Sequence, residues 1–215
     1  MAQRTIHYLL GQLLLRECPA RNRKRFLLGS ILPDAFADLS QRALTHYTNR
    51  SVPGYMYFDF DAYREQFCVK IAEDDLYLGY YMHLVEDNFY RSFFRERVGV
   101  AIDNQKPEQV QRLHLDYTLL NAYIVEQYGL RNEIERPADF ETEPLVAIAH
   151  FDLDSFLTEF DGDFSRRVEG KTRYLTEAVL EEFLARYYEP CLRELGTVMN
   201  GGRGLTARDM AWSRP

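Results

Sequence analysis

The sequence predicts an all-α protein, built as a multi-helix bundle. Apolar residues recur at intervals of three and four in several long stretches, which is the period of a helix with one buried face. No stretch alternates apolar and polar residues in the manner typical of a strand. Apolar residues make up 46% of the 215 residues and aromatic residues 14%, which is enough to bury the core of one domain. We therefore expect a single domain over residues 1–197.

The first part of the chain predicts short helices separated by turns. Residues 5–16 place their leucines and Ile6 on one helical face. A second apolar run ends at Pro33, which pushes the preceding residue out of helical geometry, so Asp34 is expected at a bend. The remaining segments of this part are a short helical piece at 40–50, a turn followed by a loop or extended stretch at 51–60, and a helix at 61–71.

The second part of the chain predicts longer helices. Residues 74–97 are apolar around much of the helix circumference, which indicates a central position in the bundle. A helix over 107–129 begins with a proline and ends at a glycine. A polar connector is expected at 131–144, followed by helices at 144–160 and 173–195 and by a flexible, glycine-containing tail at 198–215.

Charge and cysteine usage exclude several classes of protein. The net charge is −7 and the pI about 5.3, which argues against general nucleic-acid binding, because that affinity depends on Lys and Arg. Cys18, Cys68 and Cys191 lack metal-binding spacing and are odd in number, which excludes a cysteine-based zinc module and argues against a disulfide framework. The apolar N-terminal segment is too short and interrupted to span a bilayer, and no cleavage site follows it. We expect a cytoplasmic protein with no transmembrane segment; its oligomeric state stays open.

The informative residues are polar side chains inside apolar segments. His7, Asp34 and His46 each interrupt such a segment, and His83 and Asp87 are four residues apart in the strongest predicted helix, so they share one face. Taken alone, such a histidine is more often a hydrogen-bonded core residue than a metal ligand, and an aspartate after a proline is more often a turn or cap residue. As a set on separate helical segments they can converge in a bundle core, where helical proteins build metal sites.

Further polar residues are candidates for supporting roles. His114, Asp116 and Asn121 interrupt the helix predicted at 107–129, and they are either additional metal ligands, partners of ligands, or the polar face of a packed helix. Glu86 and Arg91 flank the His83/Asp87 pair. Arg91 lies one turn after Asp87, so it is expected to pair with that carboxylate or to hold a substrate phosphate.

The ordered set of five residues resembles the zinc-dependent phospholipase C superfamily, an all-helical fold shared with single-strand-specific zinc nucleases. Members carry an early histidine, an aspartate in a Pro-Asp turn, a further histidine, and an HxxxD helix preceded by a glycine. Here the matching residues are His7, Asp34 in "GSILPD", His46 in "LTHY", and His83 and Asp87 in "GYYMHLVED". The match covers about the first 90 residues.

The resemblance implies a bundle of the phospholipase C and zinc nuclease type. In such a bundle Asp34, His46, His83 and Asp87 would surround one zinc ion. His7 would reach a second metal, with Asp34 or Asp87 bridging the two. We expect one or two Zn²⁺ ions, with Mn²⁺, Fe²⁺ or Mg²⁺ as alternatives.

The leading hypothesis is therefore a metal-dependent phosphoester hydrolase, phospholipase C-like, with a metal-activated water as nucleophile. Asp34 would act as general base, and the substrate would be a small-molecule or lipid phosphoester. One alternative is a non-catalytic protein with a structural or regulatory metal, because Phe93 stands where the family has another histidine and a later HxxxE is missing. A second alternative, an HD-type metal phosphohydrolase, requires an adjacent His-Asp pair, and none of the five histidines precedes an aspartate.

Overall fold

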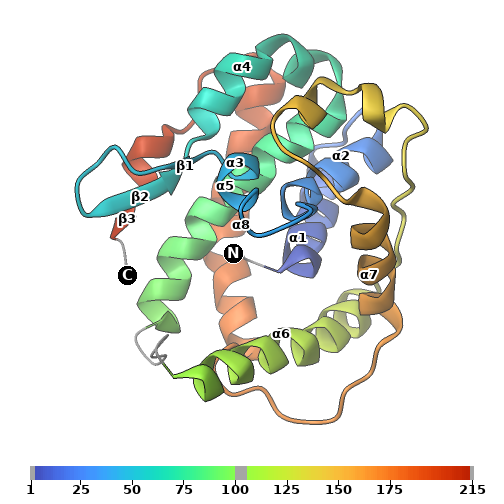
Figure 1. The fold of residues 1–215 in the computed structure, drawn as a ribbon, viewed down its shortest axis with the longest axis vertical. Helices are drawn as coiled ribbons and strands as arrows, with labels where there is room; N and C mark the ends of the chain where they lie inside the picture. Colours follow the sequence, from blue (N-terminus) through green and yellow to red (C-terminus); the bar gives the residue numbers. More distant parts are fainter. Residues whose placement is uncertain (1–2, 100–105, 214–215) are drawn as a thin grey trace.

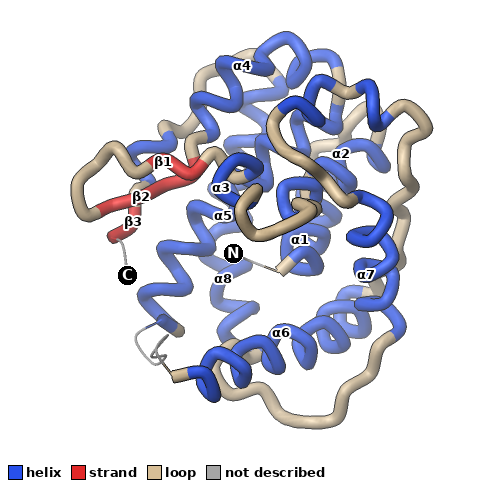
Figure 2. Tube along the Cα trace, in the orientation of Figure 1, coloured by secondary structure: helices blue, strands red, loops and turns tan. Residues whose placement is uncertain are grey.

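The computed structural model describes residues 3–99 and 106–213, and within them the chain is mostly helical (Figure 1). Its α-helices are α1 (Arg4–Glu17), α2 (Arg23–Gly29), α3 (Arg42–Thr45), α4 (Phe60–Glu73), α5 (Asp75–Arg97), α6 (Pro107–Tyr128), α7 (Leu153–Ser165) and α8 (Glu177–Met199). A small antiparallel sheet of order β1-β2-β3 lies beside them (Figure 2), formed by β1 (Thr48–Asn49), β2 (Tyr55–Phe58) and β3 (Trp212–Ser213). The prediction of a helical protein is confirmed, whereas the small sheet was not predicted.

Helix α5 forms the centre of the molecule. The Asp74 side chain caps its start by accepting a hydrogen bond from the Leu76 amide at 3.0 Å. All of its residues from Asp75 to Asn88 are buried, and it packs against α1, α2, α4 and α8. The central position predicted for residues 74–97 is thereby confirmed. Any polar group in this part of α5 must find its partners inside the protein, because water does not reach it.

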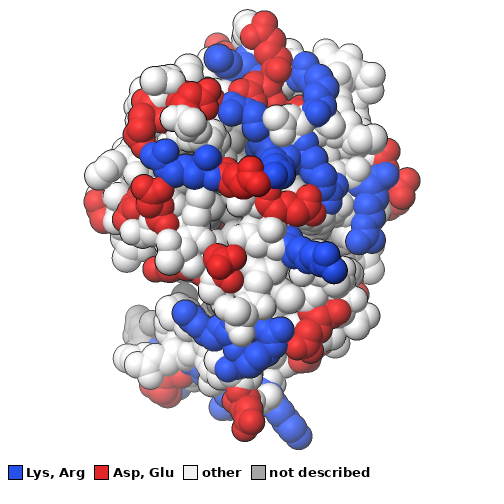
Figure 3. Space-filling model, turned by 90° about the vertical axis from the view of Figure 1, so that its right-hand side faces the viewer, with Lys and Arg blue, Asp and Glu red and all other residues white. Residues whose placement is uncertain are grey.

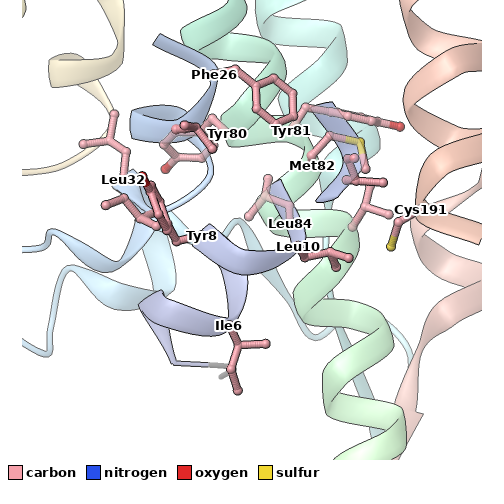
Figure 4. Close-up of a cluster of buried hydrophobic side chains, with 14 of the residues drawn as sticks. Ile6, Tyr8, Leu10, Phe26, Leu32, Tyr80, Tyr81, Met82, Leu84 and Cys191 are labelled. Carbon is pink, nitrogen blue, oxygen red and sulfur yellow. The ribbon is translucent and has the colours of Figure 1, made fainter. Parts of the chain in front are cut away.

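Apolar side chains from four helices interlock around α5 (Figure 4). Leu10 of α1, Phe26 of α2, Leu84 of α5 and Cys191 of α8 are each at most 1% exposed. The interior also contains tyrosines whose hydroxyl groups are satisfied, since Tyr81 donates a hydrogen bond to the buried Glu194 carboxylate at 2.6 Å. The core is therefore dense on this side of α5, and the Tyr81 hydroxyl has its partner inside it.

Helices α2 and α5 cross with their backbones in direct contact. A Cβ atom on Gly79 would collide with the carbonyl oxygen of Phe26, and one on Gly29 would collide with the carbonyl oxygen of Leu76. Glycine is required at both positions by this close approach. The crossing brings the carbonyl group of Ser30, the residue that follows α2, against the middle of α5.

The helix predicted at 144–160 begins later than expected. Residues Pro144–Ala147 form a short 3-10 helix, and α7 starts at Leu153, where the Asp152 side chain accepts from the Ser155 amide. The backbone in between pairs with the turn that follows Pro33, through Ala37 N to His150 O at 2.9 Å and Asp152 N to Ala35 O at 2.8 Å. These hydrogen bonds compete with helix formation, and they fix the turn that carries Asp34.

The expectation of a flexible tail from residue 198 is corrected for the residues that the structure describes; 214–215 lie outside them. Two carboxylates bind the backbone of this segment: Glu194 accepts from the Leu205 amide and Asp61 from the Ala207 amide, both at 2.8 Å. Trp212 in β3 is buried and packs edge-on against Phe58 of β2, with ring centroids 4.9 Å apart. The glycines of this segment allow its turns and do not prevent its packing.

Positive and negative side chains are interspersed on the face shown in Figure 3. The basic run at 21–25 pairs with acidic residues from distant segments, for example Arg25 with Asp74 and with Glu143, and Lys24 with Glu135. This run is therefore engaged in ion pairs within the chain. None of the described helices combines the length and the apolar composition that crossing a membrane requires.

We predict that Gly79→Ala lowers the free energy of unfolding by about 2–4 kcal/mol, because the added methyl group forces α2 away from α5. Gly196→Ala is the matched control: Gly196 also lies in a long helix, but a Cβ there meets no atom within 4 Å. That change should be neutral or stabilising by up to about 1 kcal/mol. Urea denaturation of both variants provides the measurement, and equal effects would contradict the close-contact interpretation.

Candidate metal centre

Five polar side chains meet beside the middle of α5. His7 comes from α1, Asp34 from the 3-10 turn Leu32–Asp34, His46 from the residue after α3, and His83 and Asp87 from α5. The shortest atom pairs are His46 Nε2 to His83 Nε2 at 3.3 Å, His46 Nε2 to Asp34 Oδ1 at 3.3 Å, His7 Nε2 to Asp87 Oδ1 at 3.3 Å, and His46 Nε2 to Asp87 Oδ2 at 3.6 Å. The rings of His7 and His83 are stacked, with centroids 3.8 Å apart. The structure thus brings together all five predicted residues.

The local backbone explains how the loop residues reach this place. Pro33 lies within the turn that ends at Asp34, so the chain leaves α2 in a tight bend. Tyr47, directly after His46, has a φ of 48°, a left-handed conformation that is uncommon outside glycine. This conformation reverses the chain from α3 into β1 and leaves His46 pointing inward, where Phe58 packs against its ring at 5.2 Å.

Each of the three histidines is oriented by a hydrogen bond at its outer nitrogen. The Nδ1 acceptors are the Glu86 carboxylate for His7 at 2.8 Å, the Ser30 carbonyl for His83 at 2.8 Å, and the Arg42 carbonyl for His46 at 3.1 Å. An acceptor at Nδ1 requires a proton on Nδ1, so in the neutral ring Nε2 carries the lone pair. With all three rings neutral, three Nε2 lone pairs would therefore face one another and two carboxylates, an arrangement that is repulsive unless a proton or a metal cation occupies it. Histidine ligands of metals are oriented in this same way.

Several buried atoms of the cluster are unsatisfied by the protein alone. His7 Nε2 and Asp34 Oδ1 are buried and have no hydrogen-bond partner. Two overlapping groups of three donors, each with ligand atoms within 4.8 Å of one another, could hold an ion: His7, His83 and Asp87 in one, and Asp34, His46 and His83 in the other. Asp87 approaches His7 with one oxygen and His46 with the other, which is the position of a bridging carboxylate. The donor set of imidazoles and carboxylates fits Zn²⁺ or a similar transition metal.

The two stacked histidines differ in charge when no metal is present. Burial and the neighbouring positive His7 lower the pKa of His83 to about 3, so His83 is neutral at physiological pH. Burial acts against a charge on His7 too, but the neighbouring carboxylates of Asp87 and Glu86 outweigh it and raise the pKa of His7 to about 10. Burial would raise the pKa of Asp34, but the contact with His46 and the nearby histidine charges lower it. Burial acts on Asp87 in the same direction, and neighbouring positive charge, including that of His7, lowers its pKa as well. Asp34 and Asp87 are thereby available in the ionised form that metals bind.

Glu86, which the sequence analysis expected to support the cluster, lies against His7 in the structure. Its side chain is 2% exposed and contacts His7 as described above. Arg91 is half-buried one turn beyond Asp87, and among the described residues it makes no ion pair with a carboxylate. The expected pairing of Arg91 with Asp87 is therefore not present. Phe93 is fully buried against Phe183 and Tyr187, so this position contributes only to the apolar core.

The three candidates on α6 do not join the cluster. His114 is exposed. Asp116 is buried, but its carboxylate accepts hydrogen bonds from the backbone amides of residues 173–175, the closest at 2.6 Å. Asn121 accepts from the Thr5 hydroxyl at 2.5 Å. These polar residues satisfy a loop backbone and an interhelical contact, and their proposed ligand or supporting role at the metal is corrected.

The sequence analysis did not single out Ser30 or Arg42. Ser30 acts through its backbone carbonyl, and because every residue has such a group, the residue type gives no sign of this role. Arg42 lies one turn before His46, and its half-buried side chain is close enough to Asp34 and Asp87 for their charges to act on it. The one-turn spacing between Arg42 and His46 was the signal that could have identified it.

Comparison of the chain with protein-family models, with curated proteins and with solved structures gave no match. The assignment of this centre therefore depends on the geometry of its own residues. That geometry consists of three oriented imidazoles, two ionised carboxylates and buried donor atoms without partners.

We predict that the purified protein retains stoichiometric transition metal and that His83→Ala lowers metal affinity at least about 100-fold, because His83 belongs to both donor groups. His114→Ala is the matched control and should keep the full metal content. Elemental analysis after equilibration in metal-buffered solution measures both. A metal-free wild type, or a His83→Ala protein with unchanged content, would contradict the assignment.

We further predict that metal affinity rises with pH by about tenfold per pH unit between roughly pH 7 and pH 10. The reason is that His7 carries a proton in the metal-free protein and must lose it to bind, and the slope ends once pH exceeds the raised pKa of His7. Competition titrations with a chelating dye at several pH values give the slope. His7→Gln should bind more weakly and without this slope; a wild-type affinity independent of pH would rule the mechanism out.

Proposed function

We propose that this protein is a metal-dependent hydrolase of phosphoesters, of the phospholipase C type, acting on a small-molecule or lipid substrate. The observation that carries the proposal is the convergence of three Nε2 atoms, each oriented by a hydrogen bond at Nδ1, with the carboxylates of Asp34 and Asp87. A single structural ion needs only one closed set of ligands. Two overlapping sets that share His83, with the second oxygen of Asp87 directed at His46 of the other set, suit a pair of ions, which is a common arrangement for phosphoester hydrolysis.

The residues divide between two positions. His7, His83 and Asp87 would hold one ion, and Asp34 and His46 the other, with Asp87 contributing its second oxygen. Divalent ions at such positions supply an acidified water and stabilise the charge that develops on phosphoryl oxygens. Glu86, Ser30 and the Arg42 carbonyl keep the imidazoles in the required tautomer throughout.

Asp34 is the residue that we assign as general base. Its side chain is 10% exposed, whereas those of His7, His46, His83 and Asp87 are at most 1% exposed, so it is the member of the set that reaches toward solvent. One Asp34 oxygen approaches His46, and the other is available to accept a proton from the attacking water. The short 3-10 turn and the backbone hydrogen bonds around Ala35 and Ala37 hold this carboxylate in place.

A non-catalytic role for the metal is the second candidate, and the burial of the ligands favours it. Four of the five side chains are almost fully enclosed, as in structural metal sites that tie helices together. In that case the metal would raise the thermal stability of the protein, and no phosphoester would be turned over. The two candidates therefore differ in a single measurable property.

We expect the metal-loaded protein to hydrolyse members of a phosphomonoester and phosphodiester panel and to lose this activity with a chelator. Asp34→Asn should lower kcat by about 10²–10⁴-fold, as removal of a general base does, while the ion held by His7, His83 and Asp87 remains bound. His114→Ala should retain wild-type turnover. A fully loaded protein that turns over nothing, but melts at a higher temperature than the metal-free form, would establish the structural role in place of the catalytic one.

A further inference from the structure

We propose that Thr45 is a positioning residue of the metal centre, whose hydroxyl group holds the His46 ring in one orientation both with and without metal. The hydroxyl donates a hydrogen bond to His46 Nδ1 when the centre is empty, and it accepts one from Nδ1 when Nε2 binds an ion. This inference rests on the proposed function, because it concerns how one ligand of the same centre is held and exchanged.

His46 comes from the least regular backbone of the cluster. His7 lies within a helix of 14 residues, and His83 and Asp87 lie within one of 23 residues. His46 follows a helix of only four residues, and Tyr47 after it has a left-handed conformation. So short a helix is not stable by itself, and the direction of the His46 ring therefore depends on its side-chain contacts.

The Thr45 hydroxyl is closer to the His46 ring than the Arg42 carbonyl is. Thr45 Oγ1 is 2.9 Å from His46 Nδ1, whereas the Arg42 carbonyl oxygen is 3.1 Å from the same nitrogen. The hydroxyl is also 3.2 Å from that carbonyl oxygen, so the three atoms form a triangle. Thr45 is fully buried, and its hydroxyl group must therefore find its partners inside the protein.

The Arg42 carbonyl oxygen has more donors around it than lone pairs. It accepts a hydrogen bond from the backbone amide of His46 at 3.1 Å, and both His46 Nδ1 and the Thr45 hydroxyl are within reach of it. Because a carbonyl oxygen has two lone pairs, one is left for these two groups. All are satisfied if His46 Nδ1 donates to Thr45 Oγ1 and Thr45 donates to Arg42. This chain leaves the Nε2 lone pair of His46 available for a metal ion.

The inner side of His46 favours the opposite arrangement when no metal is bound. His83 Nδ1 faces the Ser30 carbonyl, so the lone pair of neutral His83 is on Nε2, which lies 3.3 Å from His46 Nε2. Asp34 Oδ1 is also 3.3 Å from His46 Nε2, and among the described residues it has no hydrogen-bond partner. A proton on His46 Nε2 relieves this repulsion. His46 Nδ1 then carries a lone pair, to which the Thr45 hydroxyl can donate and a carbonyl oxygen cannot.

A hydroxyl group changes between these two roles by rotating its hydrogen atom. When an ion binds, the proton on His46 Nε2 leaves to solvent and Nδ1 takes up one proton from solvent, so the ring stays neutral. The hydrogen of the Thr45 hydroxyl turns at the same time from His46 to the Arg42 carbonyl. The ring itself keeps its place, and the empty centre stays assembled for the incoming ion.

The central helix fixes Thr45 at this position. Tyr80 of α5 donates a hydrogen bond from its hydroxyl to the Thr45 carbonyl oxygen at 2.5 Å. The Tyr80 ring is fully buried and stacks on that of Tyr63, with centroids 4.7 Å apart. Helix α5 therefore carries His83 and Asp87 itself and, through Thr45, also holds the turn that supplies His46.

The test compares Thr45→Val, which removes the hydroxyl group, with Thr45→Ser, which keeps it. Thr5→Val is the matched control, because Thr5 is equally buried but donates its hydrogen bond to Asn121. Nitrogen NMR of the histidine rings at about pH 8, above the usual imidazole pKa, shows which nitrogen of His46 carries the proton before and after Zn²⁺ is added. Competition with a chelating dye gives the Zn²⁺ affinities of the same samples.

We expect the wild-type His46 proton on Nε2 in the metal-free protein and on Nδ1 in the Zn²⁺-loaded protein. Thr45→Val should carry it on Nδ1 in both states, because the remaining partner, the Arg42 carbonyl, can only accept. Its Zn²⁺ affinity at the group of Asp34, His46 and His83 should rise about fivefold, the factor for one neutral hydrogen bond lost from the empty state alone.

Thr45→Ser should restore the wild-type tautomers and affinity, and Thr5→Val should change neither. A merely structural threonine gives a different result, since its replacement leaves the tautomers as they are and does not tighten metal binding. The inference is overturned by a wild-type ring with its proton on Nδ1 in the metal-free protein, by a Thr45→Val ring that matches wild type, or by Zn²⁺ binding that is weaker or unchanged in Thr45→Val.

The proposed function and this inference fail in different ways. A Zn²⁺-loaded protein with the expected tautomers but no phosphoester turnover would refute the hydrolase and leave the role of Thr45 standing. Turnover together with a His46 tautomer that does not respond to Thr45→Val would refute the role of Thr45 alone. A wild type that binds no Zn²⁺ would refute both.

Discussion

The backbone contact between α2 and α5 is the constraint on which the centre depends. Gly29 and Gly79 let the two helices approach until no side chain fits between them, and this approach delivers the Ser30 carbonyl to His83. If the two helices were farther apart by the width of one methyl group, the hydrogen bond from His83 Nδ1 to the Ser30 carbonyl would be lost. The tautomer that directs the Nε2 lone pair of His83 to the candidate metal position would then no longer be fixed. The same crossing starts the bend that leads to Asp34. A packing requirement in the apolar core thus sets the chemistry of a polar site.

The stacked rings of His7 and His83 illustrate how neighbours set the properties of identical side chains. His83 faces a neutral carbonyl and is hard to protonate, whereas His7 lies between the carboxylates of Glu86 and Asp87 and holds its proton strongly. In the absence of metal, the proton on His7 partly neutralises the buried acids. A metal ion bound as proposed would replace this proton and neutralise the carboxylates of the whole cluster.

The sequence was sufficient to find the five residues of the cluster because their signals are local. The HxxxD spacing needs only helical periodicity, and an aspartate after a proline needs only a turn. Asp116 and Asn121 show the same pattern of a polar residue in an apolar helix, yet they bind a loop backbone and Thr5. Their partners are distant in sequence, so tertiary structure decides the outcome. The strand pairing of Trp212 with β2 is equally non-local, which is why the segment was expected to be a flexible tail.

The contacts of His7 have a consequence for how the chain is held closed. An ion shared by His7 and Asp87 would join the first helix to the central one, and so it would close a loop that contains α2, α3, α4 and the first two strands. In this respect the proposed metal would act as a reversible cross-link. By the chain-entropy relation used for disulfides, closing a loop of this length lowers the conformational entropy of the unfolded chain. The folded state is thereby stabilised by on the order of 4 kcal/mol. The cysteines of the protein are free, and the metal would be the cross-link between distant parts of its chain.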